Sequence, residues 1–251
     1  MRRQGLVLPV LLVAAWQFGA LLAGAKGLEV TSPLDVLRGL ADLVKGGMPP
    51  GHRLPKHVLY SLVRVFLGYS AAIASGVPLG LALGASARVR AFIRPLVDFF
   101  RPIPPLAWVP LAIPWFGIGV TAAAFIIFLG AFFPLVLNSA AGVNTLDPVY
   151  VDAARTLDAS RLQIWTKVLV PGAMPCILTG LRVALGIAWM TLVAAEFTDV
   201  REGYGLGYMV MAARDLQRTD VVLAGMLVIG VTGLALEVGL RAAARRILRW
   251  K

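Results

Sequence analysis

Runs of apolar residues recur along the chain and are separated by short segments that carry most of its charged residues. A helix needs about 20 consecutive apolar residues to cross the hydrocarbon core of a bilayer. The pattern therefore predicts an all-α, polytopic membrane helix bundle with about six transmembrane helices, in one domain of residues 1–251. We place the spans near residues 6–25, 58–85, 102–117, 119–140, 175–195 and 219–240.

The first apolar run follows Arg2 and Arg3, and basic residues before a first span favour a cytoplasmic N-terminus. A cleaved signal peptide is the alternative, because residues 23–25 are small like those of a cleavage site. The run is longer than a usual signal core, so we expect a retained helix. After it, apolar residues at helical spacing predict a short amphipathic helix on the outer surface. They are Leu34, Leu37, Leu40, Ala41 and Val44.

The second predicted span carries small residues at every fourth position of one face: Ala72, Gly76, Gly80 and Gly84. Such a ladder lets another helix approach closely in lipid. The approaching helix belongs either to the same chain or to a second copy, and we favour packing within the chain.

The third predicted span is interrupted by proline, which lacks a backbone N–H and prevents one regular helix. Broken helices persist at membrane depth where protein covers them or where they line a water-filled cavity. The segment is therefore either a pathway-lining element or a kinked packing helix. Its prolines are Pro102, Pro104, Pro105, Pro110 and Pro114, and Trp108 lies among them. Residues 117–119 (Gly-Ile-Gly) then predict a tight outer turn.

A polar segment, residues 143–171, lies between two apolar runs. Each of its charged residues would cost several kcal/mol in lipid, so the segment must lie at the membrane surface, accessible to a soluble partner. Asp147 is suited to cap a helix that starts at Pro148 and ends near Leu157.

The position of Asp158 then requires a turn, and aspartate tolerates the left-handed backbone region better than most residues. Ser160 is suited to cap a second short helix that ends near Lys167. Two short helices at an angle predict a compact knob. An ordinary surface loop is the alternative.

Composition supports the membrane class. The chain is 59% hydrophobic, its mean hydropathy is +0.80, and only 15% of its residues are charged, whereas soluble domains have roughly 25%. The net charge of +11 is dispersed among the apolar runs, which favours loops that face lipid headgroups over nucleic-acid binding. The one cysteine, Cys176, excludes an intrachain disulfide, and we interpret it as a buried thiol.

The residues offer no catalytic or cofactor chemistry. The sequence contains neither a G-x-x-x-x-G-K-[ST] phosphate loop nor a G-x-S-x-G nucleophile elbow. His52 and His57, in the first predicted outer loop, are too few for a zinc hydrolase. We expect neither an enzyme nor a metal or cofactor site.

Basic residues are more frequent at the predicted inner ends, which supports six spans with both termini in the cytoplasm. Those that carry this bias include Arg88, Arg90, Arg94, Arg241, Arg245, Arg246, Arg249 and Lys251. Arg64, Arg101 and Arg182 fall within or beside spans, where we expect long side chains to reach the interface; an ion site is the alternative. We interpret Glu196 as an interfacial carboxylate that reaches water, with a proton or substrate site as the alternative.

The polar segment resembles the EAA loop of ABC-transporter permeases of the binding-protein-dependent import type. That motif reads E-A-A, three residues, Gly, nine residues, Ile, one residue, Leu-Pro. Ala153, Ala154 and Pro171 match it, whereas Asp152 stands for Glu and Asp158 for Gly. Val168 and Val170 replace Ile and Leu. Flanking segments resemble the nitrate, sulfonate, taurine and bicarbonate subfamily, and they are residues 101–110, 115–119, 171–175, 179–182, 195–196 and 203–208.

The resemblance implies a type I ABC importer permease that forms the pathway for a small solute such as a sulfonate, taurine or nitrate. The implied partners are two ATP-binding-cassette ATPase subunits, a periplasmic or lipid-anchored solute-binding protein and a second permease copy, in the cell (inner) membrane. The implied ATPase-coupling residues are Asp152, Ala153, Ala154, Arg155, Leu157, Asp158, Ala159 and Pro171. Candidate pathway-lining residues are Pro104, Pro105, Trp108, Pro110 and Glu196. A secondary transporter or channel that works without an ATPase is the alternative.

Overall fold

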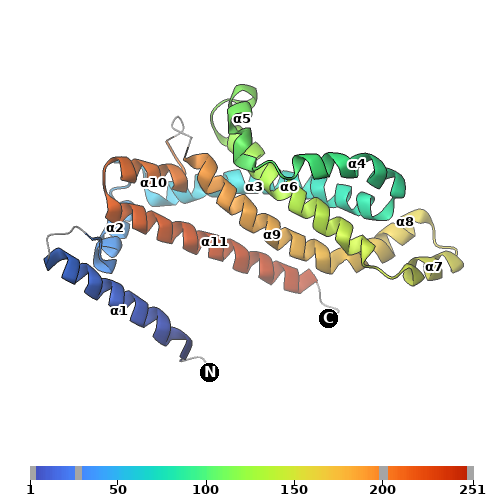
Figure 1. Ribbon diagram of the computed structural model, residues 1–251, viewed down its shortest axis with the longest axis horizontal. Coiled ribbons are helices and arrows are strands. Elements are labelled where there is room, and N and C mark those ends of the chain that lie inside the picture. The colour runs from blue at the N-terminus through green and yellow to red at the C-terminus, as the bar shows by residue number, and fades with distance from the viewer. Residues whose placement is uncertain (1–3, 26–29, 198–202, 248–251) are drawn as a thin grey trace. The chain divides into compact units, whose positions relative to one another are not determined.

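The computed structural model describes residues 4–25, 30–197 and 203–247, and all regular elements in these ranges are helical (Figure 1). The chain divides into two compact units, residues 1–60 with 203–232 and residues 61–202 with 233–251. Within the described ranges, four helices are long and apolar enough to cross a membrane, or five if one bent pair forms a single span. The predicted all-α membrane fold is confirmed, and the count of six spans stays a prediction. The basic residues Arg2, Arg3, Arg249 and Lys251 lie outside the described residues.

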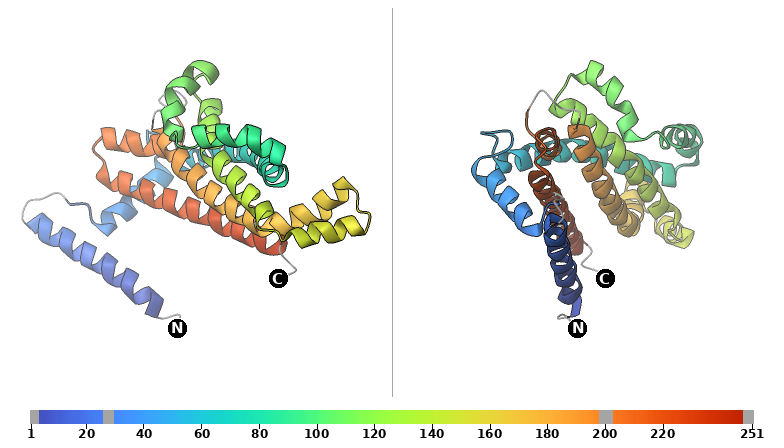
Figure 2. Two further views of the ribbon diagram at one scale, coloured as in Figure 1. Left: turned by 45° about the vertical axis from the view of Figure 1, so that its right-hand side comes forward. Right: turned by 60° about the vertical axis from the view of Figure 1, so that its left-hand side comes forward.

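Three long helices build the core of the larger unit. They are α3 (Leu54–Ala85), of which residues 61–85 belong to this unit, α6 (Val120–Asn144) and α9 (Val170–Glu196). α6 and α9 run side by side in Figure 1 and in both views of Figure 2. The second half of α11 (Thr219–Ile247) packs against the same core through Leu236 and Leu240. The buried centre consists of Val65, Ala72, Ile127, Ala131, Leu135, Ala184, Leu185, Ala188 and Leu192.

Glycines on α3 allow α6 to approach at backbone distance. A Cβ atom at Gly80 would lie 2.3 Å from the carbonyl oxygen of Val136, and one at Gly84 would lie 2.5 Å from the Cβ of Val143. Ala72, on the same face, is fully buried. The predicted packing of this small-residue ladder within the chain is confirmed.

The region around the prolines forms three short elements. α4 (Ala87–Phe100) precedes the 3-10 helix η1 (Pro105–Trp108) and α5 (Val109–Phe116). The helix axis bends by 87° between α4 and the η1–α5 element. The predicted break at the prolines is confirmed, and a span over residues 102–117 stays a prediction. Gly117 (φ +76°) and Gly119 (φ +140°) turn the chain into α6, which confirms the predicted turn.

The sequence pattern did not predict α4, because its basic residues suggested a charged inner end. Ser86 caps this helix by accepting a hydrogen bond from the N–H of Val89 at 3.4 Å. Its less exposed face packs against α3 and α6 through Val89, Ile93 and Val97. Arg90 donates to the carbonyl oxygens of Leu83 and Gly84, so it ties α4 to the last turn of α3.

The smaller unit contains α1 (Gln4–Ala25), α2 (Pro33–Lys45), the first turns of α3, α10 (Leu206–Asp215) and the first half of α11. Ser32 and Asp35 form a capping box at the start of α2, and the hydrogen bonds from Ser32 lower the pKa of the Asp35 carboxyl. The predicted helix is confirmed, but its buried face carries Val36, Gly39 and Leu43. The predicted apolar residues Leu34, Leu37 and Val44 are exposed.

An ionic cluster joins α2 to the start of α11. The guanidinium of Arg218 lies 2.8 Å from the carboxylate of Asp42 and 2.7 Å from that of Asp220. These bonds raise the pKa of Arg218 above its ordinary value. At Gly39, a Cβ atom would lie 2.9 Å from the backbone of Asp220, so α2 needs a glycine to reach this position.

The predicted outer loop over residues 199–218 is partly wrong, because residues 206–215 are helical; residues 199–202 lie outside the described ranges. His57 is fully buried in α3, not placed in a loop. The N–H of Gly205 donates to its Nδ1 at 3.1 Å, and its Nε2 lies 3.1 Å from the carbonyl oxygen of His52. Its Nδ1 also lies 2.9 Å from the carbonyl oxygen of Gly205, so the ring of His57, bonded to the backbone of both His52 and Gly205, holds the turn that precedes α10.

Candidate functional site

Two short helices, α7 (Pro148–Thr156) and α8 (Arg161–Ile164), form a knob, which we define as residues 147–164. Asp147 caps α7 by accepting the N–H of Val149 at 3.0 Å. Ser160 and Gln163 form a capping box at the start of α8. The knob projects beyond the ends of α6 and α9 (Figures 1 and 2). The caps predicted at Asp147 and Ser160 are confirmed.

The turn between the two helices has the hydrogen bonds of a Schellman motif. The N–H of Asp158 donates to the carbonyl of Arg155 at 3.0 Å, and that of Ala159 donates to the carbonyl of Ala154 at 3.1 Å. Asp158 has a φ of +53°, the left-handed conformation that the sequence predicted for this position. Glycine is the usual residue there because it has no Cβ to clash.

Asp158→Gly should therefore keep the knob folded and make it more resistant to local opening. Asp158→Val should weaken the turn by roughly 1–2 kcal/mol, because a β-branched residue strongly disfavours positive φ. Limited trypsin digestion after Arg155 and Arg161 measures this opening, and we expect slower cleavage in the glycine variant and faster cleavage in the valine variant. Equal cleavage rates in the two variants would show that the turn does not have this conformation.

The second knob helix does not end near Lys167, as the sequence predicted. It continues through a π-helical turn, η2 (Trp165–Leu169), into α9, so residues 161–196 form one continuous helical element. The N–H of Val170 donates to the carbonyl of Trp165, five residues earlier. Pro171 follows directly and has no N–H of its own, which accounts for a widened turn at this point.

The knob exposes large apolar side chains between charged ones. Leu157 is 82% exposed and Leu162 is 73% exposed, and Val149 and Tyr150 are also exposed. A groove of about 770 Å³ runs between the knob and the last turns of α3 and α6. Its lining includes Asp152, Arg155, Ala159, Arg161 and Trp165. An exposed apolar surface beside charged residues is typical of a protein docking site.

The remaining predicted coupling residues lie on or near the knob. Asp152 and Ala153 are exposed, and Ala154 is half-buried. Asp152 pairs with Arg155 at 3.1 Å, an exposed ion pair that contributes little to stability. Pro171 lies apart from them in the first turn of α9. Of the predicted coupling residues, Leu157 offers the largest apolar surface to a partner.

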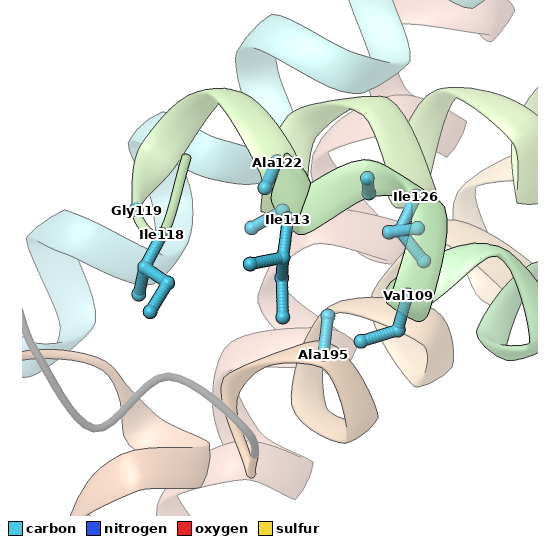
Figure 3. Close-up of a pocket in the computed structure, with 9 residues that line it drawn as sticks. Val109, Ile113, Ile118, Gly119, Ala122, Ile126 and Ala195 are labelled. Carbon is cyan, nitrogen blue, oxygen red and sulfur yellow. The ribbon is translucent and has the colours of Figure 1, made fainter. Parts of the chain in front are cut away.

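The proline-rich segment packs on α6 and α9 through small side chains. Ala112, Ala122, Ile126 and Ala195 form a buried cluster, against which Trp108 packs. A small apolar pocket of about 30 Å³ lies here, and Figure 3 shows its lining residues on α5, on α6, on the turn between them and on α9. Pro104, Pro105, Trp108 and Pro110 do not line this pocket, and their place along a transport pathway stays a prediction.

The interpretation of Arg64 and Glu196 as side chains that reach the interface is wrong. Both are fully buried, and Arg64 Nη1 donates to Glu196 Oε1 at 2.8 Å. The hydroxyl of Ser61 lies 2.7 Å and 3.0 Å from the two carboxylate oxygens. Cys176 is half-buried rather than buried. Arg64 and Glu196 pair because a lone buried charge would be far more costly than a hydrogen-bonded ion pair.

The sequence of this chain matches a known protein family. The model of the family described as "Binding-protein-dependent transport system inner membrane component" matches residues 76–249, which include the knob, α9 and all of α11. The chain belongs to this family. The permease is 41% identical over 239 residues to the taurine transport system permease protein TauC of Escherichia coli, covering 95% of this chain and 86% of TauC. It is 32% identical to the nitrate import permease protein NrtB of Synechocystis, covering 94% of this chain and 85% of NrtB.

The fold of the permease also matches a solved transporter. An inward-facing structure of the MetNI methionine ABC transporter contains a chain that superposes with a TM-score of 0.64 at 21% identity. The match covers 78% of this chain and 94% of the other. The chain therefore has the fold of an ABC importer permease, and its family is one of transport-system membrane components.

Proposed function

We propose that this permease is the pathway-forming subunit of an ABC importer whose energy comes from separate ATPase subunits. Two permease copies form the pathway, and one ATPase docks on each knob at the cytoplasmic face. A periplasmic or lipid-anchored solute-binding protein delivers the solute outside. Both termini lie in the cytoplasm. ATP hydrolysis belongs to the partner subunits.

The exposed apolar surface of the knob is the observation that carries this proposal. Leu157 and Leu162 contribute little to the fold, because most of each side chain lies in solvent. The charged residues around them, Asp158 and Arg161, keep this surface out of lipid. A soluble partner is therefore the chemistry that fits the knob. The continuous helix that leaves the knob provides a path into the membrane-spanning core.

The cargo is a small sulfonate, with taurine as the first compound to test. The support is the 41% identity to TauC over nearly the whole chain. Nitrate, which the name of the more distant NrtB contains, is the second compound. Calorimetric titration of the cognate solute-binding protein with taurine and with nitrate distinguishes them.

Ala154→Arg should abolish co-purification of the ATPase and uptake of solute. Ala154 is half-buried in the Schellman turn, so a long cationic side chain there displaces the docking surface. Ala154→Ser keeps the side chain small and should behave like the native chain. The measurement is the mass of the complex by native mass spectrometry together with uptake into cells.

Normal uptake of solute by the Ala154→Arg variant would show that the knob takes no part in transport. Uptake that persists without bound ATPase and follows a proton gradient would instead support an ATPase-independent transporter. The Ala154→Arg and Ala154→Ser variants together distinguish these two outcomes.

A further inference from the structure

The helix that begins in the knob ends at a buried ion pair. Residues 161–196 form one continuous helical element, which is about 54 Å long at 1.5 Å per residue. Its first residue lies in α8, and its last residue is Glu196. The carboxylate of Glu196 is bound to α3 by Arg64 at 2.8 Å and by Ser61 at 2.7 Å. A displacement of α8 therefore acts on an element whose far end is fixed to another helix.

The helical element of residues 161–196 has a turn at which it can bend, and beyond that turn it packs along two other helices. The π-helical turn Trp165–Leu169 lies between α8 and α9, and π-turns within helices are frequent at functional sites. Beyond it, α9 follows α6 closely, since a Cβ atom at Gly142 would lie 2.9 Å from the Cys176 Cβ. The hydroxyl of Tyr69 on α3 donates to the carbonyl of Leu181 at 2.8 Å. The α9 part of this helical element is thus held between α3 and α6.

The ion pair differs from the apolar contacts around it in how it responds to movement. Apolar surfaces can slide by a fraction of a turn and remain in contact. A buried ion pair is either made or broken, because a separated charge in this environment is strongly unfavourable. Glu196 also lies at the C-terminal end of α9, where the helix dipole disfavours a carboxylate. Stability alone does not account for this arrangement, since a well-packed apolar pair is often at least as stable.

We propose that Arg64 and Ser61 are positioning residues that bind Glu196 and so make the far end of α9 move together with α3, as one body, when the ATPase displaces the knob. The inference rests on the proposed function, because it requires an ATPase on the knob. It assigns to this pair a mechanical role rather than a role in binding solute. Arg64 and Glu196 should be either joined or separated in each state of the transport cycle.

The test uses the complete complex of permease and ATPase, in liposomes, with Cys176→Ser as the background. Phe197 directly follows Glu196 and is 42% exposed, so Phe197→Cys places a thiol at the end of the helical element of residues 161–196. A membrane-impermeant maleimide measures its labelling rate without nucleotide and with the ATPase trapped by ADP and vanadate. We expect trapping to change the labelling rate several-fold when Arg64 and Glu196 are present.

The decisive variant replaces the pair with apolar residues, Arg64→Met with Glu196→Leu. This change removes both charges together, so the variant should assemble with a melting temperature close to that of the Cys176→Ser parent. Its complex with the ATPase should bind and hydrolyse ATP, but the response of residue 197 to trapping should be lost. A response equal to that of the parent would overturn the inference. Arg64→Lys keeps a cation opposite Glu196 and should retain the response even if the apolar variant fails to assemble.

An Arg64→Lys complex that assembles and shows no response would also contradict the proposed role of the charge pair. A parent complex that traps ADP and vanadate without any change at residue 197 would do the same. These outcomes differ from failure of the proposed function, in which the parent permease binds no ATPase at all.

Discussion

Leu162→Asp should weaken binding of the ATPase by at least about tenfold and reduce uptake to a similar extent. Burial of a leucine side chain contributes roughly 1.5–3 kcal/mol, and 1.4 kcal/mol corresponds to a factor of ten in affinity. Leu162 is 73% exposed in the isolated chain, so the permease itself should fold normally. Leu162→Met keeps the apolar surface and is the matched control.

The measurement is the dissociation constant of the detergent-solubilised permease for its ATPase, together with initial uptake rates in cells. Unchanged affinity in the aspartate variant would mean that Leu162 faces something other than the ATPase. Loss of permease from the membrane in the same variant would mean that the side chain supports the fold instead. Leu157→Asp, on the neighbouring turn, should behave in the same way.

Gly80→Ala should destabilise the permease by roughly 1–3 kcal/mol, the usual cost of overpacking a close contact. Its new Cβ would lie 2.3 Å from the carbonyl oxygen of Val136 and 2.6 Å from the Cβ of Ser139, so α3 and α6 must separate. Gly186 lies inside α9 with no atom within 4 Å of a Cβ built on it. Gly186→Ala should therefore stabilise the chain by roughly 0.5–1 kcal/mol, as alanine does within a helix.

The two alanine variants have opposite expected signs, and thermal unfolding in detergent measures both. A lowered midpoint for Gly80→Ala and a raised one for Gly186→Ala would support the α3–α6 contact. A raised midpoint for both variants would show that the helices are not so close at Gly80. Assembly with the ATPase, measured on the same samples, shows whether separation of α3 from α6 reaches the knob.

Local hydrogen-bond chemistry explains what could be predicted from the sequence. Asp147, Asp158 and Ser160 act on backbone groups no more than three residues away, so their positions alone predict two capped helices and a left-handed turn. The glycine ladder was predictable for a similar reason, since its spacing places all members on one face of a helix. Neither inference required knowledge of distant contacts.

The features that could not be predicted depend on distance in the chain. Arg64 and Glu196 are separated by 132 positions, and each by itself resembles a side chain that reaches the membrane interface. The continuity of α8 with α9 was hidden by Pro171, because proline within a helical pattern usually marks an end. α10 follows a glycine-rich turn, and that turn suggested a loop where Leu206, Met209 and Ala213 in fact face inward.

The proposed docking of the ATPase on the knob, at the cytoplasmic face, is tested most directly by the accessibility of one thiol. Leu157→Cys in the Cys176→Ser background gives a permease whose one cysteine lies on the knob. A membrane-impermeant maleimide should leave it unlabelled in intact cells, label it in inverted membrane vesicles, and lose access when the ATPase is bound. Labelling of residue 157 in intact cells would place the knob outside and contradict the proposed route of energy into this permease.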